Sequence, residues 1–378
     1  MDDAGTKVRN SRMKITFRTD ASLQIGTGHV MRCLTLARAL REAGAVCRFI
    51  TRAHPGNMAD RIKADGFEVS LLPAPEGPLP PGPPVHAYWA GVDWKQDAAE
   101  MRAVLGDAPD WLVMDHYAFD ARWQRAVLPE GTRLMVIDDL ADRPHACDLM
   151  LDQNLGRNVA AYDGLVPDHC MRLIGPQYAL LRPEFAAMRL RSTAERAGRG
   201  LCHILITMGG VDAQDATSQI LDAIAGADLP DDLRICVIMG AQAPALEKVR
   251  GKAQELPWPT EVLVDVSDMA SRMANADLAI GAGGATTWER CCLGLPSIIV
   301  QIADNQAGIA QSIAAVGAGV DLGPVKNSNF ERNMHAALVQ ACNPAILSML
   351  SENAAATCDG IGTERVLAQI GVGVTHEN

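Results

Sequence analysis

Hydrophobic positions in this chain fall into short runs rich in leucine and β-branched residues, and these runs alternate with longer stretches of helical period. In the first half, the short runs predict strands at residues 14–17, 46–51, 69–72, 111–114, 134–137 and 149–151. In the second half, they predict strands at residues 203–207, 234–239, 261–264, 278–280 and 297–302. Strands that alternate with helices are typical of a parallel sheet flanked by helices, so we expect an α/β fold.

The length of 378 residues favours two domains, because a single hydrophobic core rarely grows that large. Residues 1–12 are polar and aperiodic, and we expect a disordered extension there. The pattern then predicts one Rossmann-like domain over 13–181, a linker over 182–200, and a second Rossmann-like domain over 201–378 that ends in closing helices. A Pro/Gly-rich stretch at 73–84 predicts a surface loop. Two such domains imply a cleft at the carboxyl ends of their strands.

Charge and cysteine content exclude several kinds of partner and site. With 34 Lys and Arg against 45 Asp and Glu, the net charge is -11, so we expect neither a nucleic acid nor a membrane as partner. No apolar stretch reaches the roughly 20 residues of a membrane span, and the N-terminus lacks the layout of a signal peptide, which predicts a cytoplasmic protein. The ten cysteines are scattered without zinc-site spacing, which predicts free thiols and no metal.

The segment from residue 17 to 33 runs from a strand through a glycine-containing loop into an amphipathic helix. This pattern places His29 in the first helical turn, where the positive end of the helix dipole disfavours a second positive charge. We therefore expect a neutral imidazole, the form that a general base needs. Gly26 and Gly28 permit close approach of a ligand, but Gly-x-Gly alone is a weak signal. On this segment alone, a structural first-turn residue is the simpler interpretation of His29.

A second segment, residues 112–117, delivers three polar side chains to the carboxyl end of an apolar strand: Asp115, His116 and Tyr117. Residues at such a strand end tend to face the cleft. Asp115 could orient a base, hold a sugar hydroxyl, or only cap the next turn. Tyr117 could equally pack on the rim of the cleft.

The second half carries two glycine pairs at strand ends. Gly209 and Gly210 follow its first predicted strand, and Gly283 and Gly284 precede a helix that begins with threonines. Backbone N–H groups at such turns can approach phosphate oxygens, which predicts a pyrophosphate site. The absence of Gly-Lys-Ser/Thr excludes a P-loop.

Three further polar residues extend this prediction. Glu289, one turn into the helix, can accept hydrogen bonds from two ribose hydroxyls, although pairing with a neighbouring cation is an alternative. Asn305 and Gln306 follow the next strand, where they could contact a sugar or its phosphates. A simple helix cap is the other interpretation of this strand end.

Taken together, these segments resemble a known family. The motifs are Arg18-x-Asp20-Ala21-Ser22-x-x-Ile25-Gly26-x-Gly28-His29-x-x-Arg32-Cys33-Leu34, Asp115-His116-Tyr117, Gly175-Pro176-x-Tyr178-Ala179-Leu180-Leu181-Arg182-Pro183-Glu184-Phe185 and Gly283-Gly284-x-Thr286-Thr287-Trp288-Glu289. As a set, and in this order from Met13 onward, they resemble the UDP-2,4-diacetamido-2,4,6-trideoxy-beta-L-altropyranose hydrolases of pseudaminic acid biosynthesis. That family is similar in fold to the GT-B glycosyltransferases, but its acceptor is water.

The resemblance implies two Rossmann-like domains facing a cleft, release of UDP by inverting attack at C1, and no metal or other cofactor. It implies His29 as the catalytic base. It implies contacts to the substrate from Asp20, Gly26, Gly28, Arg32, Asp115, His116, Tyr117, Asn305 and Gln306. Together with the two glycine pairs, it leads us to expect contacts to UDP from Gly209, Gly210, Gly283, Gly284, Thr286, Thr287 and Glu289. One departure is Ala285, where many relatives carry Ser, and the missing hydroxyl bears on phosphate affinity more than on activity.

Three alternatives to a hydrolase stay open. The first is a GT-B glycosyltransferase that passes a UDP-amino sugar to an alcohol or lipid, although the first domain shows no long apolar docking stretch. The second is a non-catalytic module that only binds a nucleotide sugar. The third is a UDP-sugar 2-epimerase, which the Gly-x-Gly-His start fits less well. The exact sugar, partner proteins and oligomeric state do not follow from the motifs.

Overall fold

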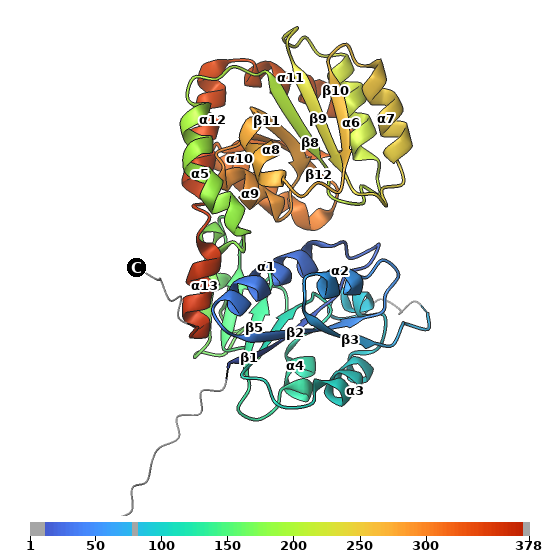
Figure 1. Ribbon diagram of the computed structural model, residues 1–378, viewed down its shortest axis with the longest axis vertical. Helices are drawn as coiled ribbons and strands as arrows, with labels where there is room; N and C mark the ends of the chain where they lie inside the picture. Colours follow the sequence, from blue (N-terminus) through green and yellow to red (C-terminus); the bar gives the residue numbers. More distant parts are fainter. Residues whose placement is uncertain (1–11, 78–81, 373–378) are drawn as a thin grey trace, which may run out of the picture.

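The computed structural model describes residues 12–77 and 82–372, so nearly all of the predicted extension, 1–11, lies outside the described residues, as do four residues of the predicted 73–84 loop. The described chain contains two parallel sheets, each covered by helices on both faces (Figure 1). This architecture confirms the predicted fold class.

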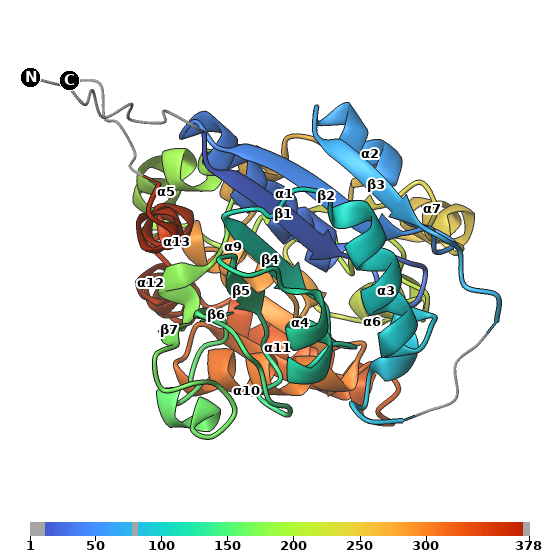
Figure 2. The same cartoon turned by 90° about the horizontal axis from the view of Figure 1, so that it is seen from below.

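The first sheet has seven strands in the order β3-β2-β1-β4-β5-β6-β7 (Figure 2). Its central strands are almost entirely buried, as a parallel sheet with two covered faces requires. The strands are β1 (Lys14–Thr19), β2 (Val46–Arg52), β3 (Glu68–Leu72), β4 (Trp111–Asp115), β5 (Arg133–Ile137), β6 (Leu149–Asp152) and β7 (Met171–Ile174). The helices are α1 (Gly28–Glu42), α2 (Ala59–Ala64), α3 (Trp94–Leu105) and α4 (Ala121–Val127), with the short 3₁₀ turns η1 (Ala87–Ala90), η2 (Val159–Tyr162) and η3 (Pro176–Tyr178).

The second sheet has six strands in the order β10-β9-β8-β11-β12-β13. The strands are β8 (His203–Thr207), β9 (Arg234–Met239), β10 (Thr260–Val264), β11 (Leu278–Ala282), β12 (Ser297–Gln301) and β13 (Gly319–Pro324). The helices are α6 (Ala216–Ala225), α7 (Leu246–Glu255), α8 (Met269–Asn275), α9 (Thr286–Cys292), α10 (Ala307–Ala315), α11 (Phe330–Ala341) and α12 (Pro344–Thr357), with the 3₁₀ turn η4 (Asp304–Gln306). No helix within 12–77 and 82–372 is long and apolar enough to cross a membrane.

Both sheets reverse their strand order at the first strand. In the first sheet, β1 lies between β2 and β4, and in the second, β8 lies between β9 and β11. Chains leave the two neighbours of such a strand toward opposite faces, which opens a crevice at its carboxyl end. The fold therefore offers one crevice beyond β1 and β4 and another beyond β8 and β11.

Two strands were not predicted, and each lacks the pattern that reveals a strand. The outermost strand of the first sheet, β7, has only four residues, and its first residue is exposed. The outermost strand of the second sheet, β13, contains two glycines, an aspartate and a proline. Edge strands tolerate such residues because one side needs no partner, so neither forms a continuous apolar run.

The chain crosses between the domains twice. Helix α5 (Pro183–Arg196) packs on α8, α9 and α12 of the second domain, and α13 (Gly362–Ile370) returns to pack on α1 of the first (Figure 1). Val366, Leu367 and Ile370 join the core of the first domain because they form the apolar face of an amphipathic helix. The last helix thus lies with the first domain, which differs from the predicted division at residue 201.

We expect Ile370→Ala to destabilise the first domain by about 2–4 kcal/mol, because it removes a fully buried side chain from the contact of α13 with that domain. The carbonyl of Ile370 also accepts a hydrogen bond of 3.1 Å from Trp111 Nε1, which gives the region a fluorescent reporter. Urea unfolding followed by tryptophan fluorescence measures the change. Val339→Ala, at a side chain 60% exposed on α11, is the matched control, and an equal loss there would contradict the packing role.

Candidate functional site

A cavity of about 310 Å³ lies between the carboxyl ends of the two sheets. Helix α1 lies on the side of the first domain that faces the second (Figure 1). The first domain and the linker contribute Thr27, Gly28, Met31, Arg32, Thr35, Leu180, Leu181 and Arg182 to its wall. The second domain contributes Thr207, Gly209, Gly210, Ile238, Met239, Gly240, Asp265, Val266, Met269, Ala285, Thr286 and Glu289.

His29 stands beside this cavity, in the first turn of α1, as predicted from the sequence. Its imidazole is fixed by Asp115 at the end of β4, whose Oδ1 lies 2.6 Å from His29 Nδ1. An ionised carboxylate can only accept hydrogen bonds, so Nδ1 carries the proton of the neutral ring. The other ring nitrogen, Nε2, is therefore the one that can take up a proton.

Asp115 is fully buried and is held by Arg32 from the next turn of α1. Arg32 donates to both of its oxygens, from Nε to Oδ2 at 2.5 Å and from Nη2 to Oδ1 at 2.7 Å. Burial alone would raise the pKa of the Asp115 carboxyl, but the charge of Arg32 and the hydrogen bonds from Arg32 and His29 hold that pKa well below its usual range. The carboxylate is therefore charged at neutral pH.

Side chains of opposite charge approach the same nitrogen of His29. The Asp115 carboxylate lies 2.6 Å from Nδ1, and Arg32 Nη2 lies 3.3 Å from it. The start of α1 carries the ring, so the imidazole is fixed between the helix and the end of β4.

Two aromatic rings enclose the imidazole. The ring of Tyr117 meets it edge to face at 4.6 Å between centroids, and Trp89 does so at 6.1 Å. The two rings stack on each other at 5.3 Å, and the Tyr117 hydroxyl donates to Asp139. Tyr117 therefore lies against the imidazole of His29 with its hydroxyl already engaged. Trp89, from η1, was not predicted; its signal was the aromatic Tyr88-Trp89 pair just after the Pro/Gly-rich stretch.

The structure places Asp20 and His116 outside the cavity wall, in contact with each other. Both side chains are buried, and Asp20 Oδ2 lies 3.1 Å from His116 Nε2. Asp20 Oδ1 accepts from Arg18 Nη1 at 2.6 Å and from the backbone N–H of Arg52 at 2.7 Å. The buried guanidinium groups of Arg18 and Arg52 need negative charges nearby, and the Asp20 carboxylate supplies one such charge.

Of the two predicted glycines in the first domain, Gly26 lies in the loop before α1 and Gly28 is the first residue of that helix. Gly26 adopts a φ of +79°, which favours glycine, and its N–H donates to Ser22 O at 2.8 Å. Gly28 lines the cavity, and a Cβ added there would meet nothing within 4 Å. Close approach of a ligand to this loop is thus sterically open at Gly28.

In the second domain, four of the predicted residues line the cavity: Gly209, Gly210, Thr286 and Glu289. The φ of +89° at Gly209 again favours glycine. Gly283 and Gly284 form the turn between β11 and α9, at the edge of the cavity wall.

Gly283 lies against η4, where an added Cβ would come within 3.2 Å of the Gln306 side chain. The Gln306 amide oxygen accepts from the N–H of Ile302 at 3.0 Å, so this side chain shapes the strand end. Asn305 is exposed beside it and lies outside the cavity wall. Thr287 is buried outside the cavity wall, and its hydroxyl accepts a hydrogen bond from Arg290 Nη2 at 2.9 Å.

Glu289 meets a cation that was not predicted as part of the site, Arg182 of the linker. Glu289 Oε1 lies 3.5 Å from Arg182 Nη2, and Arg182 Nη1 lies 3.0 Å from Glu184 Oε1. Burial raises the pKa of the Glu289 carboxyl, and the charge of Arg182 opposes that rise. Glu289 therefore pairs with a neighbouring cation, which was one of the two interpretations of this residue, and it also lines the cavity.

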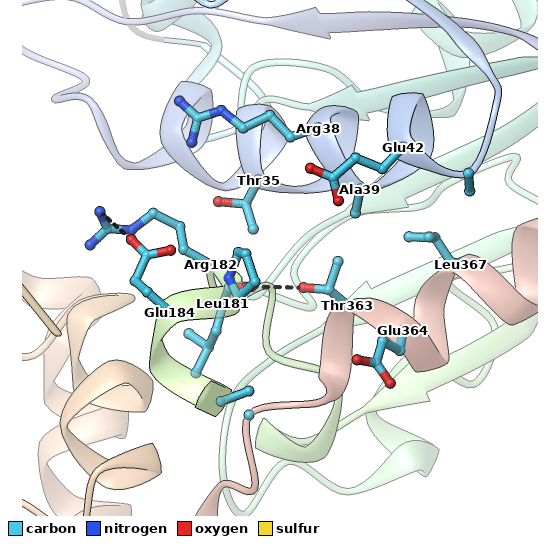
Figure 3. A pocket seen from close by; sticks show the side chains of 14 residues that line it. Thr35, Arg38, Ala39, Glu42, Leu181, Arg182, Glu184, Thr363, Glu364 and Leu367 are labelled. Atoms are coloured by element: carbon cyan, nitrogen blue, oxygen red, sulfur yellow. Dashed lines mark hydrogen bonds and ion pairs between the residues drawn. The ribbon is translucent and has the colours of Figure 1, made fainter. Parts of the chain in front are cut away.

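Arg182 also borders a second cavity, of about 520 Å³, between α1, the linker and α13 (Figure 3). Thr35, Leu181 and Arg182 line both cavities. The linker arginine thus connects the cleft with the region where the chain crosses between domains. Sequence reasoning missed it because its partner Glu289 is distant along the chain.

Comparison with known proteins supports these assignments of fold. Residues 203–341 match the glycosyltransferase family 28 C-terminal domain. The chain is 24% identical to the UDP-2,4-diacetamido-2,4,6-trideoxy-beta-L-altropyranose hydrolase of Campylobacter jejuni over 311 residues, which cover 82% of this chain and 99% of that protein. It is 34% identical over 152 residues to the spore coat polysaccharide biosynthesis protein SpsG of Bacillus subtilis, covering 39% of this chain and 43% of that protein. The resemblance inferred from the motifs is confirmed.

Among solved structures, the fold is similar to that of MurG from Acinetobacter baumannii. The TM-score is 0.68 at 17% identity, with 96% of this chain and 99% of that chain covered. The arrangement of two Rossmann-like domains facing a cleft, as in GT-B glycosyltransferases, is therefore confirmed.

We expect Asp97→Asn to destabilise the first domain by about 3–5 kcal/mol, because it removes a buried counter-charge. Asp97 Oδ2 accepts from Arg18 Nη2 and from Arg52 Nη2, each at 2.7 Å, beneath the candidate site. Urea unfolding measures the loss. Glu100→Gln is the matched control, since Glu100 pairs with the same Arg52 from a side chain 21% exposed and should cost less than about 1 kcal/mol. Equal losses in the two variants would refute the proposed importance of the buried pair.

Proposed function

We propose that this chain hydrolyses a UDP-linked 2,4-diacetamido-2,4,6-trideoxy sugar at its anomeric carbon, releasing UDP and the free sugar for pseudaminic, or nonulosonic, acid biosynthesis. The observation that carries the proposal is the His29–Asp115 pair at the cleft, with Nδ1 and Oδ1 2.6 Å apart and Nε2 left as the basic nitrogen. The similarity to the Campylobacter jejuni hydrolase, which extends over nearly the whole of that protein, supports the choice of reaction.

In the proposed reaction, His29 Nε2 takes a proton from water as the water oxygen attacks C1. A bond forms between that oxygen and C1, and the bond from C1 to the β-phosphate oxygen breaks with its electron pair leaving on UDP. Asp115 holds the ring in the required tautomer and stabilises the imidazolium that forms. Attack from the face opposite the leaving group inverts the configuration at C1.

The diphosphate would bind along the second-domain wall. Gly209 and Gly210 line it with backbone that has no side chain to exclude a phosphate, and Thr286 adds a hydroxyl. Hydrogen-bond donors fixed before the reaction stabilise the charge that develops on the leaving oxygen. Glu289 would accept from the ribose hydroxyls at the same wall.

A glycosyltransferase is the second candidate, because residues 203–341 match the glycosyltransferase family 28 C-terminal domain. The first domain favours water as acceptor. His29 is only 9% exposed and is flanked by Tyr117 and Trp89, and such limited access favours a small nucleophile such as water.

Incubation with UDP-amino sugars in oxygen-18 water tests the reaction directly. We expect UDP release without any added acceptor and the label at C1 of the free sugar, because water attacks the anomeric carbon. Mass spectrometry of both products locates the label. Label in UDP would place the cleavage at phosphorus, and turnover only with an added alcohol or lipid would establish the glycosyltransferase instead.

The same assay on His29→Asn should show a loss of turnover of about 10²–10⁴-fold, the usual contribution of a general base. The dissociation constant of UDP should stay within about twofold, since the proposed base does not hold the nucleotide. His169→Asn, at a side chain 68% exposed, is the control for losing any imidazole. Turnover near that of the wild type in His29→Asn would exclude the proposed base.

The pair of Arg182 and Glu289 makes UDP binding depend on pH. Binding to the ribose is strongest with Glu289 ionised, so affinity is present above the pKa of its carboxyl and is lost as pH falls through that pKa. Arg182→Gln removes the charge that keeps this pKa down, so the loss should begin at higher pH than in the wild type. Calorimetric titration with UDP across pH measures the shift, and comparison with the wild type cancels the titration of UDP itself.

Glu184→Gln is the matched control for this experiment. It removes a carboxylate that raises the pKa of the Glu289 carboxyl and that also engages Arg182, so the loss of affinity should move to lower pH. Shifts of the same sign in the two variants would argue against an electrostatic link between Arg182 and Glu289.

A further inference from the structure

Arg290 is a fully buried arginine in the second turn of α9, the helix whose residues Thr286 and Glu289 line the cavity assigned to the diphosphate. The other fully buried arginines, Arg18 and Arg52, each bind the carboxylate of Asp97 at 2.7 Å. Within 12–77 and 82–372, no carboxylate lies within ion-pair distance of the Arg290 guanidinium. Its positive charge is therefore unpaired in the part of the chain that the structure describes.

The guanidinium closes the base of the Gly283–Gly284 turn. Its Nη2 donates to the carbonyl of Ala282, one residue before the turn, and to the hydroxyl of Thr287, three residues after it. Each of these hydrogen bonds is 2.9 Å long. Its Nη1 lies against Gly281, where an added Cβ would come within 2.0 Å of it. Gly281 is thus a glycine because the arginine occupies the space of a side chain.

Several donors of this side chain remain unused. Neither Nε nor Nη1 of Arg290 has a hydrogen-bond partner among the described residues. Burial lowers the pKa of Arg290 to about 10, so the group is still charged at neutral pH. A buried charge without a partner opposes folding, and such groups persist where a ligand or function compensates for them.

The second-domain wall of the cavity lacks the cations that a diphosphate usually meets. Among the described residues, its side chains include no lysine, arginine or histidine, but they do include the carboxylates of Asp265 and Glu289. Ala285, at the start of α9, has no hydroxyl to offer a phosphate either. A dianionic ligand at this wall therefore needs positive charge from behind the backbone, where the low dielectric preserves its reach.

We propose that Arg290 is a positioning residue for the diphosphate: it pins the Gly283–Gly284 turn from beneath, and its unpaired charge attracts the phosphates bound on the other side of that turn. The bound nucleotide thereby supplies the counter-charge that the protein itself omits. This inference rests on the proposed function only in taking UDP as the ligand of the cavity, and it does not depend on hydrolysis.

The test compares the affinities of UDP and uridine in the wild type, Arg290→Met, Arg290→Gln and Arg290→Lys. We expect both neutral variants to bind UDP at least about tenfold more weakly while uridine affinity changes by less than about twofold, because only the diphosphate senses the charge. Arg290→Lys should keep most of the preference for UDP. Calorimetry and ligand-observed NMR measure the two affinities.

Arg250→Met is the matched control, because it removes the same charge from the second domain at a side chain that is 46% exposed and outside the cavity wall. Its preference for UDP over uridine should match that of the wild type. Thermal unfolding without ligand gives a second measure: the neutral variants should unfold at or above the wild-type temperature, because a buried unpaired charge has been removed.

Three outcomes would overturn the inference. One is unchanged affinity for both UDP and uridine in Arg290→Met, and another is equal weakening of both ligands, which would assign Arg290 to the shape of the turn alone. The third is failure of the neutral variants to fold, which would show that the charge serves the folded chain itself. Failure of the proposed function is distinct, because it would appear as UDP binding without hydrolysis in the wild type.

Discussion

The geometry of the candidate site depends on the carboxylate of Asp115. Asp115 ends β4, and it binds both His29 and Arg32, which lie one turn apart on α1. This arrangement exists because β1, whose loop leads into α1, pairs directly with β4, so that the start of the helix and the end of the neighbouring strand meet at one edge of the sheet. Asp115 at once orients the imidazole, neutralises Arg32 and joins the helix to the sheet.

The two domains treat buried charge in different ways. Beneath the first domain's edge, Arg18 and Arg52 share Asp97 and also contact Asp20, so the charges balance inside the protein and the strand ends are rigidly fixed. Beneath the second domain's edge, Arg290 has no such carboxylate among the described residues. Balanced buried charges beneath the first domain's edge suit a side chain that must hold one orientation. The surplus positive charge of Arg290 beneath the second domain's edge suits the binding of an anion.

Much of the fold could be read from the sequence because interior parallel strands are continuous apolar runs, and the polar residues at their carboxyl ends mark the cleft. His29, Asp115 and Glu289 were singled out by such patterns; the structure brings the first two into contact and places Glu289 in the cavity wall. It was harder to predict which of two consecutive residues at a strand end would face the cleft, because their side chains point in opposite directions. Asp115 contacts His29, whereas His116 contacts buried Asp20. Trp89 and Arg182 were missed because their partners lie far away along the chain, where no local pattern reports the contact.

The two crossings between the domains lie in contact with each other. The hydroxyl of Thr363 donates to the carbonyl of Leu181 at 3.1 Å (Figure 3), and at Gly362 an added Cβ would come within 2.4 Å of the Ala179 carbonyl oxygen. Two connecting segments that lie side by side permit one domain to rotate relative to the other about the line that joins the segments, but they resist twisting and sliding of the domains. Relative motion of the two domains would therefore be mainly a rotation about this contact, with little sliding of one domain along the other.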